Sequence, residues 1–264
     1  MNPRPLGRTG LSVPPLGLGT VKFGRTRALK YASAPAALPT DEHCLCLLSA
    51  AQEAGVTLID TAPAYGVSEA RLGELLPRIA PRSAWTIITK AGEIFDPATG
   101  ESRYDFSPAA LEASVTNSLA ALRVDHIDIL LLHFPGGALD AETLARPDAV
   151  AALERLQRAG KARRIGASLG SLAGAHLALA DSSPLDVVML TLNPADLAMH
   201  PAIARADARG LGVLIKKPLA SGHADPAAAL TLALGTPGVS AAILGTTSIA
   251  HLQSAVRRAN TLAP

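Results

Sequence analysis

The sequence predicts a single-domain (β/α)8 barrel that covers residues 1–264. Short apolar runs rich in Val, Ile and Leu recur eight times, and longer amphipathic segments separate them. Most of the runs lack polar–apolar alternation, which is typical of parallel strands covered on both faces. Eight such repeats favour a closed barrel over an open doubly wound sheet. The expected strands are residues 14–20, 56–60, 85–90, 126–133, 162–168, 185–192, 211–217 and 240–246.

Helix signals occupy the segments between these strands. Thr40 is expected to cap a helix that ends at Gly55, and acidic residues fill its first turn. Ser107 followed by Pro108 predicts the start of a helix, because proline suits the first helical position. A further helix is expected over 149–161. Three more serines are candidate caps of later helices: Ser68, Ser171 and Ser248.

The composition limits the kinds of partner. Hydrophobic residues make up 48% of the chain and the net charge is +2, which gives no electrostatic case for nucleic acid. No uncharged apolar run is long enough to cross a membrane, and the first residues lack the apolar segment of a signal peptide. The seven histidines show no metal-ligand spacing, so no metal is expected. We expect a cytoplasmic protein without nucleic acid or membrane partners.

Four polar side chains are expected at the carboxyl ends of successive strands, where barrels carry their functional residues. They are Asp60, Tyr65, Lys90 and His133. Together they suit proton transfer to or from an oxygen. An adjacent ammonium is expected to lower the pKa of the tyrosine from its usual ~10. Asp60 would pair with Lys90, and His133 would donate to the substrate oxygen or orient it.

Several segments of the chain resemble the aldo-keto reductases. They include RPLGRTGLSVPPLGLGT, GVTLIDTAPAYGVSEARLGELL, TIITKAG, SLAALRVDHIDILLLHFP and AAILGTTSIAHLQSA, in the family's order. The resemblance implies a nicotinamide cofactor bound without a Rossmann fold, and Asp60, Tyr65, Lys90 and His133 match its catalytic positions. The implied cofactor contacts are Gly19, Thr20, Asp60, Ser168, Met189, Lys216, Pro218, Leu219, Ser221, Gly222, Gly245, Thr246, Thr247, Ser248 and His251.

The chain departs from the family pattern in its expected cofactor contacts. Leu169 replaces an asparagine, Met189 a glutamine, and Lys216 roughly takes the place of an aromatic residue. The last phosphate loop has Gly245 or Thr247 in place of a basic residue. We therefore expect NADP(H) or NAD(H), with a slight preference for NADP(H). Residues 28–39 form a candidate lid, and the candidate pocket aromatics are Phe23, Phe95, Tyr104, Phe106 and Phe134.

The leading functional hypothesis is hydride transfer between NAD(P)H and a small aldehyde, ketone or sugar, with Tyr65 as general acid and base. One alternative is a cofactor-binding regulatory or sensor module on a reductase fold. A second is a Schiff-base lyase that uses Lys90 as its amine. The sequence leaves the oligomeric state open, a monomer included, together with the physiological substrate.

Overall fold

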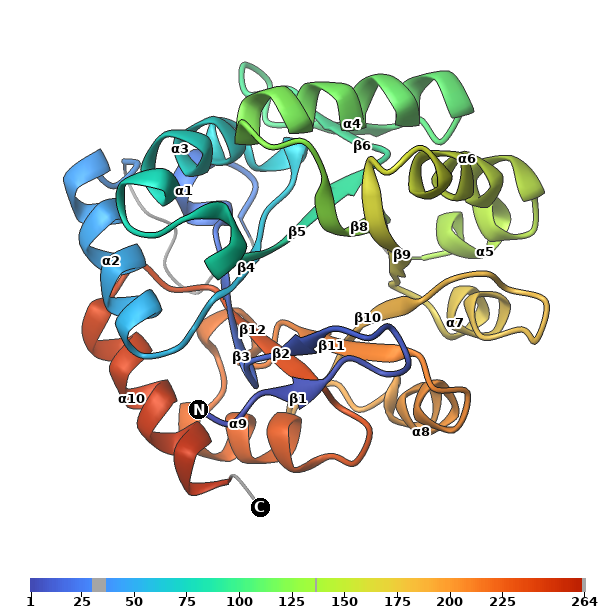
Figure 1. Cartoon of the computed structure of the whole chain (residues 1–264). Helices are drawn as coiled ribbons and strands as arrows, with labels where there is room; N and C mark the ends of the chain where they lie inside the picture. The colour runs from blue at the N-terminus through green and yellow to red at the C-terminus, as the bar shows by residue number, and fades with distance from the viewer. Residues whose placement is uncertain (30–36, 136, 263–264) are drawn as a thin grey trace.

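The computed structural model describes residues 1–29, 37–135 and 137–262. Eight parallel strands close into a barrel in the order β10-β11-β12-β3-β4-β5-β8-β9, and helices surround it (Figure 1). All eight coincide with the expected runs, which confirms the predicted (β/α)8 fold. The barrel strands are β3 (Leu16–Gly19), β4 (Leu58–Asp60), β5 (Thr86–Ala91), β8 (Ile127–His133), β9 (Ala162–Ser168), β10 (Val187–Thr191), β11 (Gly212–Lys216) and β12 (Ala241–Leu244).

Helices follow the strands around the outside of the barrel. The α-helices are α1 (Val21–Gly24), α2 (Asp41–Glu53), α3 (Ser68–Leu75), α4 (Pro108–Leu122), α5 (Leu139–Leu144), α6 (Pro147–Arg158), α7 (Leu172–Ala178), α8 (His200–Ala208), α9 (Pro226–Gly235) and α10 (Ile249–Thr261). The short 3-10 turns are η1 (Pro63–Tyr65), η2 (Leu76–Arg78), η3 (Arg82–Ala84) and η4 (Ala220–Gly222).

The predicted helix caps are correct in all but one case. The side chains of Thr40, Ser107, Ser171 and Ser248 each accept a hydrogen bond from a backbone N–H in the first turn of their helix. Ser68 was expected to be a cap but lies inside α3. Its hydroxyl is instead buried against the residues that follow β3 and β4, where it donates to Thr20 Oγ1 at 2.8 Å.

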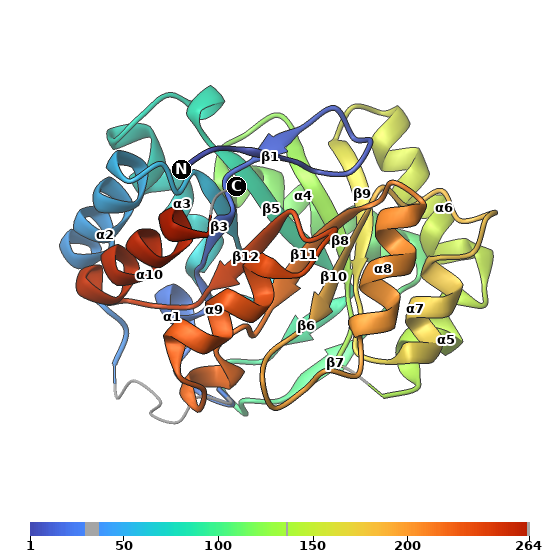
Figure 2. The same cartoon turned by 90° about the horizontal axis from the view of Figure 1, so that it is seen from below.

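Two layers of apolar side chains hold the barrel together. A large cluster fills the space between the strands and the helices, and a smaller one fills the barrel interior. The interior cluster continues into a short N-terminal hairpin, β1 (Arg4–Pro5) with β2 (Ser12–Val13), whose Leu6 and Val13 are fully buried. This hairpin covers the amino-terminal end of the barrel, so the interior is packed rather than open (Figures 1 and 2).

A second hairpin lies at the opposite end of the barrel. It consists of β6 (Glu93–Phe95) and β7 (Ser102–Tyr104), and it follows β5 directly. Figure 2 shows this hairpin and the N-terminal hairpin at opposite ends of the strands. Because the barrel strands end on the β6–β7 side, the hairpin adds side chains to the end where the expected functional residues lie.

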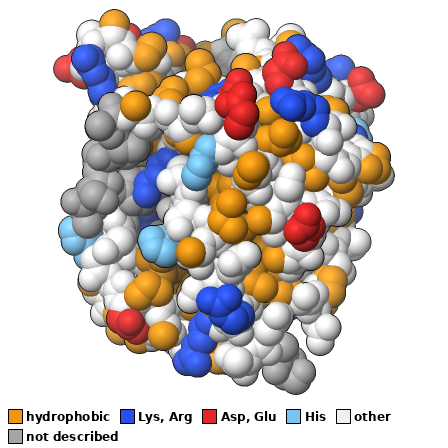
Figure 3. Space-filling model, turned by 90° about the vertical axis from the view of Figure 1, so that its left-hand side faces the viewer, with side chains coloured by type: hydrophobic (Ala, Val, Ile, Leu, Met, Phe, Trp, Pro, Cys, Tyr) orange, Lys and Arg blue, Asp and Glu red, His pale blue; other side chains and the backbone are white. Residues whose placement is uncertain are grey.

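The surface is mixed in character. Figure 3 shows the face seen from the left of Figure 1, where side chains of both charges are scattered among apolar and uncharged ones. None of the described helices is long and apolar enough to cross a bilayer. The expected lid at 28–39 lies for the most part, at residues 30–36, outside the described residues.

Candidate active site

Asp60, Tyr65 and Lys90 meet at the carboxyl end of the barrel, as the sequence predicts. Asp60 ends β4, and Lys90 lies one residue before the end of the neighbouring strand β5. The Lys90 ammonium donates to Asp60 Oδ1 at 2.6 Å, to the Thr61 carbonyl at 2.8 Å and to the Tyr65 hydroxyl oxygen at 3.2 Å. Because Lys90 is only 2% exposed, the carboxylate compensates a charge that is otherwise costly to bury.

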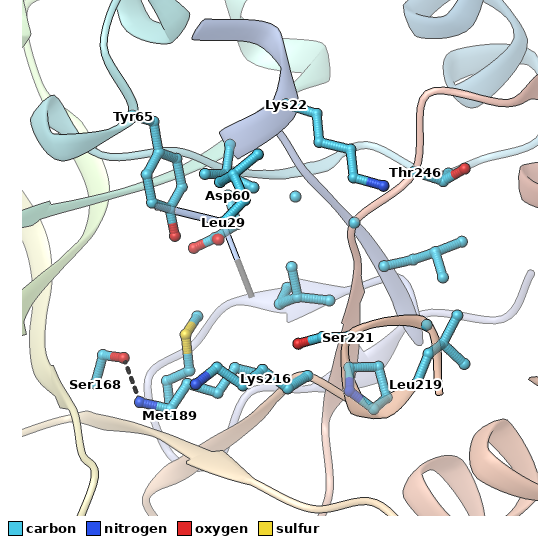
Figure 4. Close-up of a pocket in the computed structure, with 18 of the residues that line it drawn as sticks. Lys22, Leu29, Asp60, Tyr65, Ser168, Met189, Lys216, Leu219, Ser221 and Thr246 are labelled. Atoms are coloured by element: carbon cyan, nitrogen blue, oxygen red, sulfur yellow. Dashed lines mark hydrogen bonds between the residues drawn. The ribbon is translucent and has the colours of Figure 1, made fainter. Parts of the chain in front are cut away.

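A tight turn brings Tyr65 to this group. The residue is the last of η1, and Gly66 follows it with a φ of 63°. A Cβ atom at Gly66 would also meet the carbonyl oxygen of Gly24, so the turn and the close approach of α1 both require glycine. The Tyr65 ring lies edge-on to His133, with the ring centroids 6.0 Å apart. Figure 4 shows the Tyr65 hydroxyl pointing into the cavity beside Asp60.

The expected effect of Lys90 on Tyr65 is wrong for the protein without ligand. Burial raises the pKa of Tyr65 well above 10, and the negative charges of Asp60 and Glu93 raise it further. Arg25 opposes this rise but does not outweigh it. The physical reason is that burial disfavours the charged phenolate, and the two nearby carboxylates disfavour it further. Tyr65 is therefore a neutral phenol that can donate a proton at neutral pH.

His133 lies next to a carboxylate that the sequence analysis missed. Its Nδ1 lies 2.9 Å from Glu93 Oε2, on the β6–β7 hairpin. Burial lowers the pKa of His133, although Glu93 opposes this shift. Burial would by itself raise the pKa of Glu93, but contacts with His133, Ser102 and Arg25 lower it to about 2. Glu93 therefore brings a permanent negative charge to the ring.

Glu93 is itself held by two further contacts. Ser102 Oγ donates to Glu93 Oε1 at 2.6 Å, and Arg25 Nη1 lies 3.5 Å from the same oxygen. The Arg25 guanidinium also covers the Phe95 ring, 3.6 Å from its centroid. A three-residue strand such as β6 is too short to show a periodic pattern, which is why the sequence did not reveal this hairpin.

The four residues border a cavity of about 780 Å³ at the carboxyl end of the barrel. Most of the expected cofactor contacts line this cavity, and they converge from several strand ends and loops. They are Gly19, Asp60, Ser168, Met189, Lys216, Pro218, Leu219, Ser221, Gly222, Gly245, Thr246 and His251. Of the candidate aromatics, Tyr104 and Phe134 also line it, whereas Phe23 is fully buried in the core.

Three expected cofactor contacts are not among the lining residues. Thr20 is fully buried, and its hydroxyl donates to the Asp60 carbonyl at 3.0 Å, which ties β3 to β4. The Thr247 carbonyl contacts His43 Nε2 at 2.6 Å. Ser248 uses its hydroxyl to cap α10. Each of these three residues therefore makes a hydrogen bond within the protein, through its hydroxyl or its carbonyl.

The lining fits a long ligand with phosphate groups. After β11, four residues of the loop 217–222 have positive φ: Lys217, Ala220, Ser221 and Gly222. Left-handed residues can turn successive N–H groups towards an anion, but here the Ala220 and Gly222 N–H groups already donate to the Lys217 and Leu219 carbonyls. Gly245 and Thr246 lead into the 13-residue helix α10, whose N-terminus also favours an anion. Apolar walls from Leu219, Leu230 and Ile243 complete the cavity.

Two basic side chains outside the expected cofactor contacts also line the cavity. Lys22 from α1 and Arg258 from α10 are both among them. Arg258 donates from Nε and Nη2 to Thr231 Oγ1, at 3.1 and 2.6 Å. The signal that could have found Lys22 is its position two residues after Thr20, directly behind the first barrel strand. Among the described residues, no group of His, Cys, Asp and Glu could hold a metal ion.

A closed parallel barrel with a buried lysine–carboxylate pair beside a tyrosine hydroxyl defines an α/β-barrel protein with an acid–base site. Comparison with known proteins agrees with this class. A model of the aldo/keto reductase family matches residues 15–228, more than half of the chain. The chain therefore belongs to the aldo/keto reductase family.

Similar proteins were found both by sequence and by structure. The chain is 33% identical to a D-threo-aldose 1-dehydrogenase from Pseudomonas sp, over 74% of this chain and 63% of that protein. It is 29% identical to an L-galactose dehydrogenase from Arabidopsis thaliana, over 83% of this chain and 66% of that protein. The chain thus spans just under two thirds of the length of both relatives.

A solved structure described as a candidate aldo-keto reductase from Pseudomonas aeruginosa is 42% identical, with a TM-score of 0.87. The match covers 98% of this chain and 95% of that one. An aldo-keto reductase from Bacillus halodurans is 22% identical, with a TM-score of 0.82 over 98% of this chain and 90% of that one. This second likeness shows the shared fold.

Proposed function

We propose that this chain transfers hydride between NAD(P)H and a small aldehyde, ketone or sugar, with Tyr65 as the general acid and base. The observation that carries the proposal is the group formed by Lys90, Asp60 and the Tyr65 hydroxyl at the wall of the cavity. Family membership and the sugar dehydrogenases among its relatives support the same reaction class.

The residues of the chain supply the proton and the orientation. The nicotinamide, when bound, supplies or accepts the hydride. In reduction, the Tyr65 hydroxyl donates its proton to the carbonyl oxygen as negative charge develops there. Lys90, at 3.2 Å, then stabilises the phenolate that Tyr65 becomes. In oxidation the same groups act in reverse, and the phenolate accepts the proton of the alcohol.

The second polar group near the site is the His133–Glu93 pair. The carboxylate favours a proton on Nδ1, because two unprotonated acceptors 2.9 Å apart would repel each other. We infer that Glu93 is a positioning residue, which fixes the orientation and the protonated nitrogen of the His133 ring. His133 then helps to orient the substrate oxygen against Tyr65.

Loop 217–222, Gly245, Thr246 and His251 would hold the phosphates of the cofactor, and Ser168 with Lys216 would face its nicotinamide end. We propose that both NADP(H) and NAD(H) bind, with NADP(H) preferred by less than ~100-fold, since Lys22 and Arg258 supply positive charge. Titration calorimetry with both cofactors tests this preference. An affinity for NADP(H) more than a thousandfold above that for NAD(H) would contradict the proposed preference.

The substitution Tyr65→Phe tests the assigned acid. It keeps the ring and removes the hydroxyl that Lys90 contacts, so turnover should fall by at least ~10²-fold while cofactor affinity stays within about twofold. The measurement is steady-state reduction of aldehydes, ketones and aldoses, followed by cofactor absorbance. The wild-type protein, measured in parallel, is the control. Near-normal turnover of the variant would refute the role of Tyr65.

A further inference from the structure

The cavity contains a second lysine with surroundings unlike those of Lys90. Lys216 ends β11, and its side chain lines the cavity (Figure 4). Its ammonium nitrogen lies 3.1 Å from Ser168 Oγ, to which it donates. None of the ion pairs among the described residues involves Lys216. A hydroxyl partner leaves the amine without the compensation that a carboxylate gives to Lys90.

The charges around Lys216 favour its neutral form. Burial is the largest cause that lowers the pKa of Lys216, and the positive charges of Lys217 and Lys90 lower it further. Asp140 and Asp60 oppose the shift but are too far away to form ion pairs, and the pKa is lowered to about 7. His133 also faces this group, and its own pKa is lowered in part by the Lys216 charge. A large fraction of Lys216 therefore carries a free lone pair at neutral pH.

A neutral amine in a cavity that admits carbonyl compounds is a nucleophile. We propose that Lys216, in the protein without cofactor, captures small aldehydes as an imine. The amine nitrogen attacks the carbonyl carbon, a C–N bond forms as the C=O π bond breaks, and one proton moves from nitrogen to oxygen to give a neutral carbinolamine. A second proton, from solvent, then lets the hydroxyl leave as water as the C–O bond breaks, which gives the protonated imine, so no oxidant or reductant is needed.

This proposal places covalent aldehyde binding at Lys216 and excludes it at Lys90. The Lys90 nitrogen donates to a carboxylate, a carbonyl and a hydroxyl, at 2.6, 2.8 and 3.2 Å, which occupies three N–H bonds. Attack by this nitrogen would break those contacts and leave the Asp60 carboxylate without its partner, and this disfavours the hypothesis of a Schiff-base lyase that uses Lys90. The inference rests on the proposed function only in that the cavity admits small carbonyl compounds.

The test is reductive trapping. The full chain, freed of nucleotide, is incubated with propanal and sodium cyanoborohydride at pH 7, and the propylated lysines are mapped by peptide mass spectrometry over time. Lys216 is expected to react at least tenfold faster than Lys161, an exposed lysine that precedes β9. At about pH 10.5 this advantage should shrink towards unity, because exposed lysines then also lose their protons.

Two variants complete the experiment. Lys216→Arg keeps a positive charge but cannot form the imine, so the rapidly formed propyl adduct should disappear. In Lys161→Met, the rapidly formed adduct at Lys216 should remain. Tyr65→Phe should trap propanal at the wild-type rate, which separates this inference from the hydride-transfer proposal. Preferential labelling of Lys90 or Lys217, or a Lys216 rate no greater than that of Lys161 at pH 7, would overturn the inference.

Discussion

Lys90 and Lys216 line the same cavity from the ends of two strands, yet only Lys90 has a carboxylate within ion-pair distance. Lys90 has Asp60 at 2.6 Å, whereas Lys216 has the Ser168 hydroxyl at 3.1 Å and two other lysines as its main electrostatic neighbours. The difference shows what a carboxylate partner contributes to a buried lysine: burial lowers the pKa of Lys216 to about 7, and no carboxylate lies close enough to offset that shift.

The largest effect is expected for Lys90→Met. The substitution leaves the buried Asp60 carboxylate without its partner, so the free energy of unfolding should fall by about 3–5 kcal/mol, and turnover should fall by at least ~10²-fold. Urea unfolding and steady-state kinetics measure the two effects. If the single variant does not fold, the double variant Asp60→Asn with Lys90→Met should recover part of the stability. A stable and active Lys90→Met protein would remove the contrast between the two lysines.

The substitution Lys216→Met should act in the opposite direction and stabilise the protein. The folded-state pKa of about 7 lies below the unfolded value of ~10.4, so the unfolded chain binds more protons between these values. Lys216 therefore destabilises the folded wild type most below pH 7, and this destabilisation disappears as the pH rises towards 10.4. We expect a gain of about 1–3 kcal/mol at pH 7 that disappears near pH 10.5.

Urea unfolding of Lys216→Met at pH 7, 8.5 and 10.5 checks this dependence, with Lys161→Met as the control on an exposed lysine. A loss of stability at pH 7 would mean that the Lys216 amine is charged and well compensated, which would make the two lysines alike.

A smaller effect is expected for Glu93→Gln, which removes the charge next to His133. The pKa of Glu93 is lowered to about 2, so its stabilising contribution is complete above ~4.3 and is lost as the pH falls through about 2. The variant should lose about 1–2 kcal/mol at pH 7, and the difference from wild type should narrow below pH 4. Thermal unfolding across pH 2.5–7 measures this, with exposed Glu101→Gln as control. A difference that does not change with pH would point to packing instead.

Much of the architecture was already readable in the sequence. Each barrel strand is a local run of Val, Ile and Leu, and the helix caps at Thr40, Ser107, Ser171 and Ser248 are local hydrogen-bonding motifs. Once the strands are parallel and closed, Asp60 and Lys90 must share one end of the barrel. This is why the sequence alone predicts that the lysine, the carboxylate and the tyrosine are neighbours.

The tertiary structure decided the chemistry of these groups, because pKa values depend on charges and burial contributed by distant segments. The sequence predicted Asp60, Tyr65 and Lys90 as neighbours but not the raised pKa of Tyr65, which depends on burial and on Glu93 from the β6–β7 hairpin. Nor did it predict that the buried Thr20 hydroxyl donates to the Asp60 carbonyl. Local patterns of apolar residues determine the strands and helices, while the acceptor closest to each buried charge is determined only when the barrel closes.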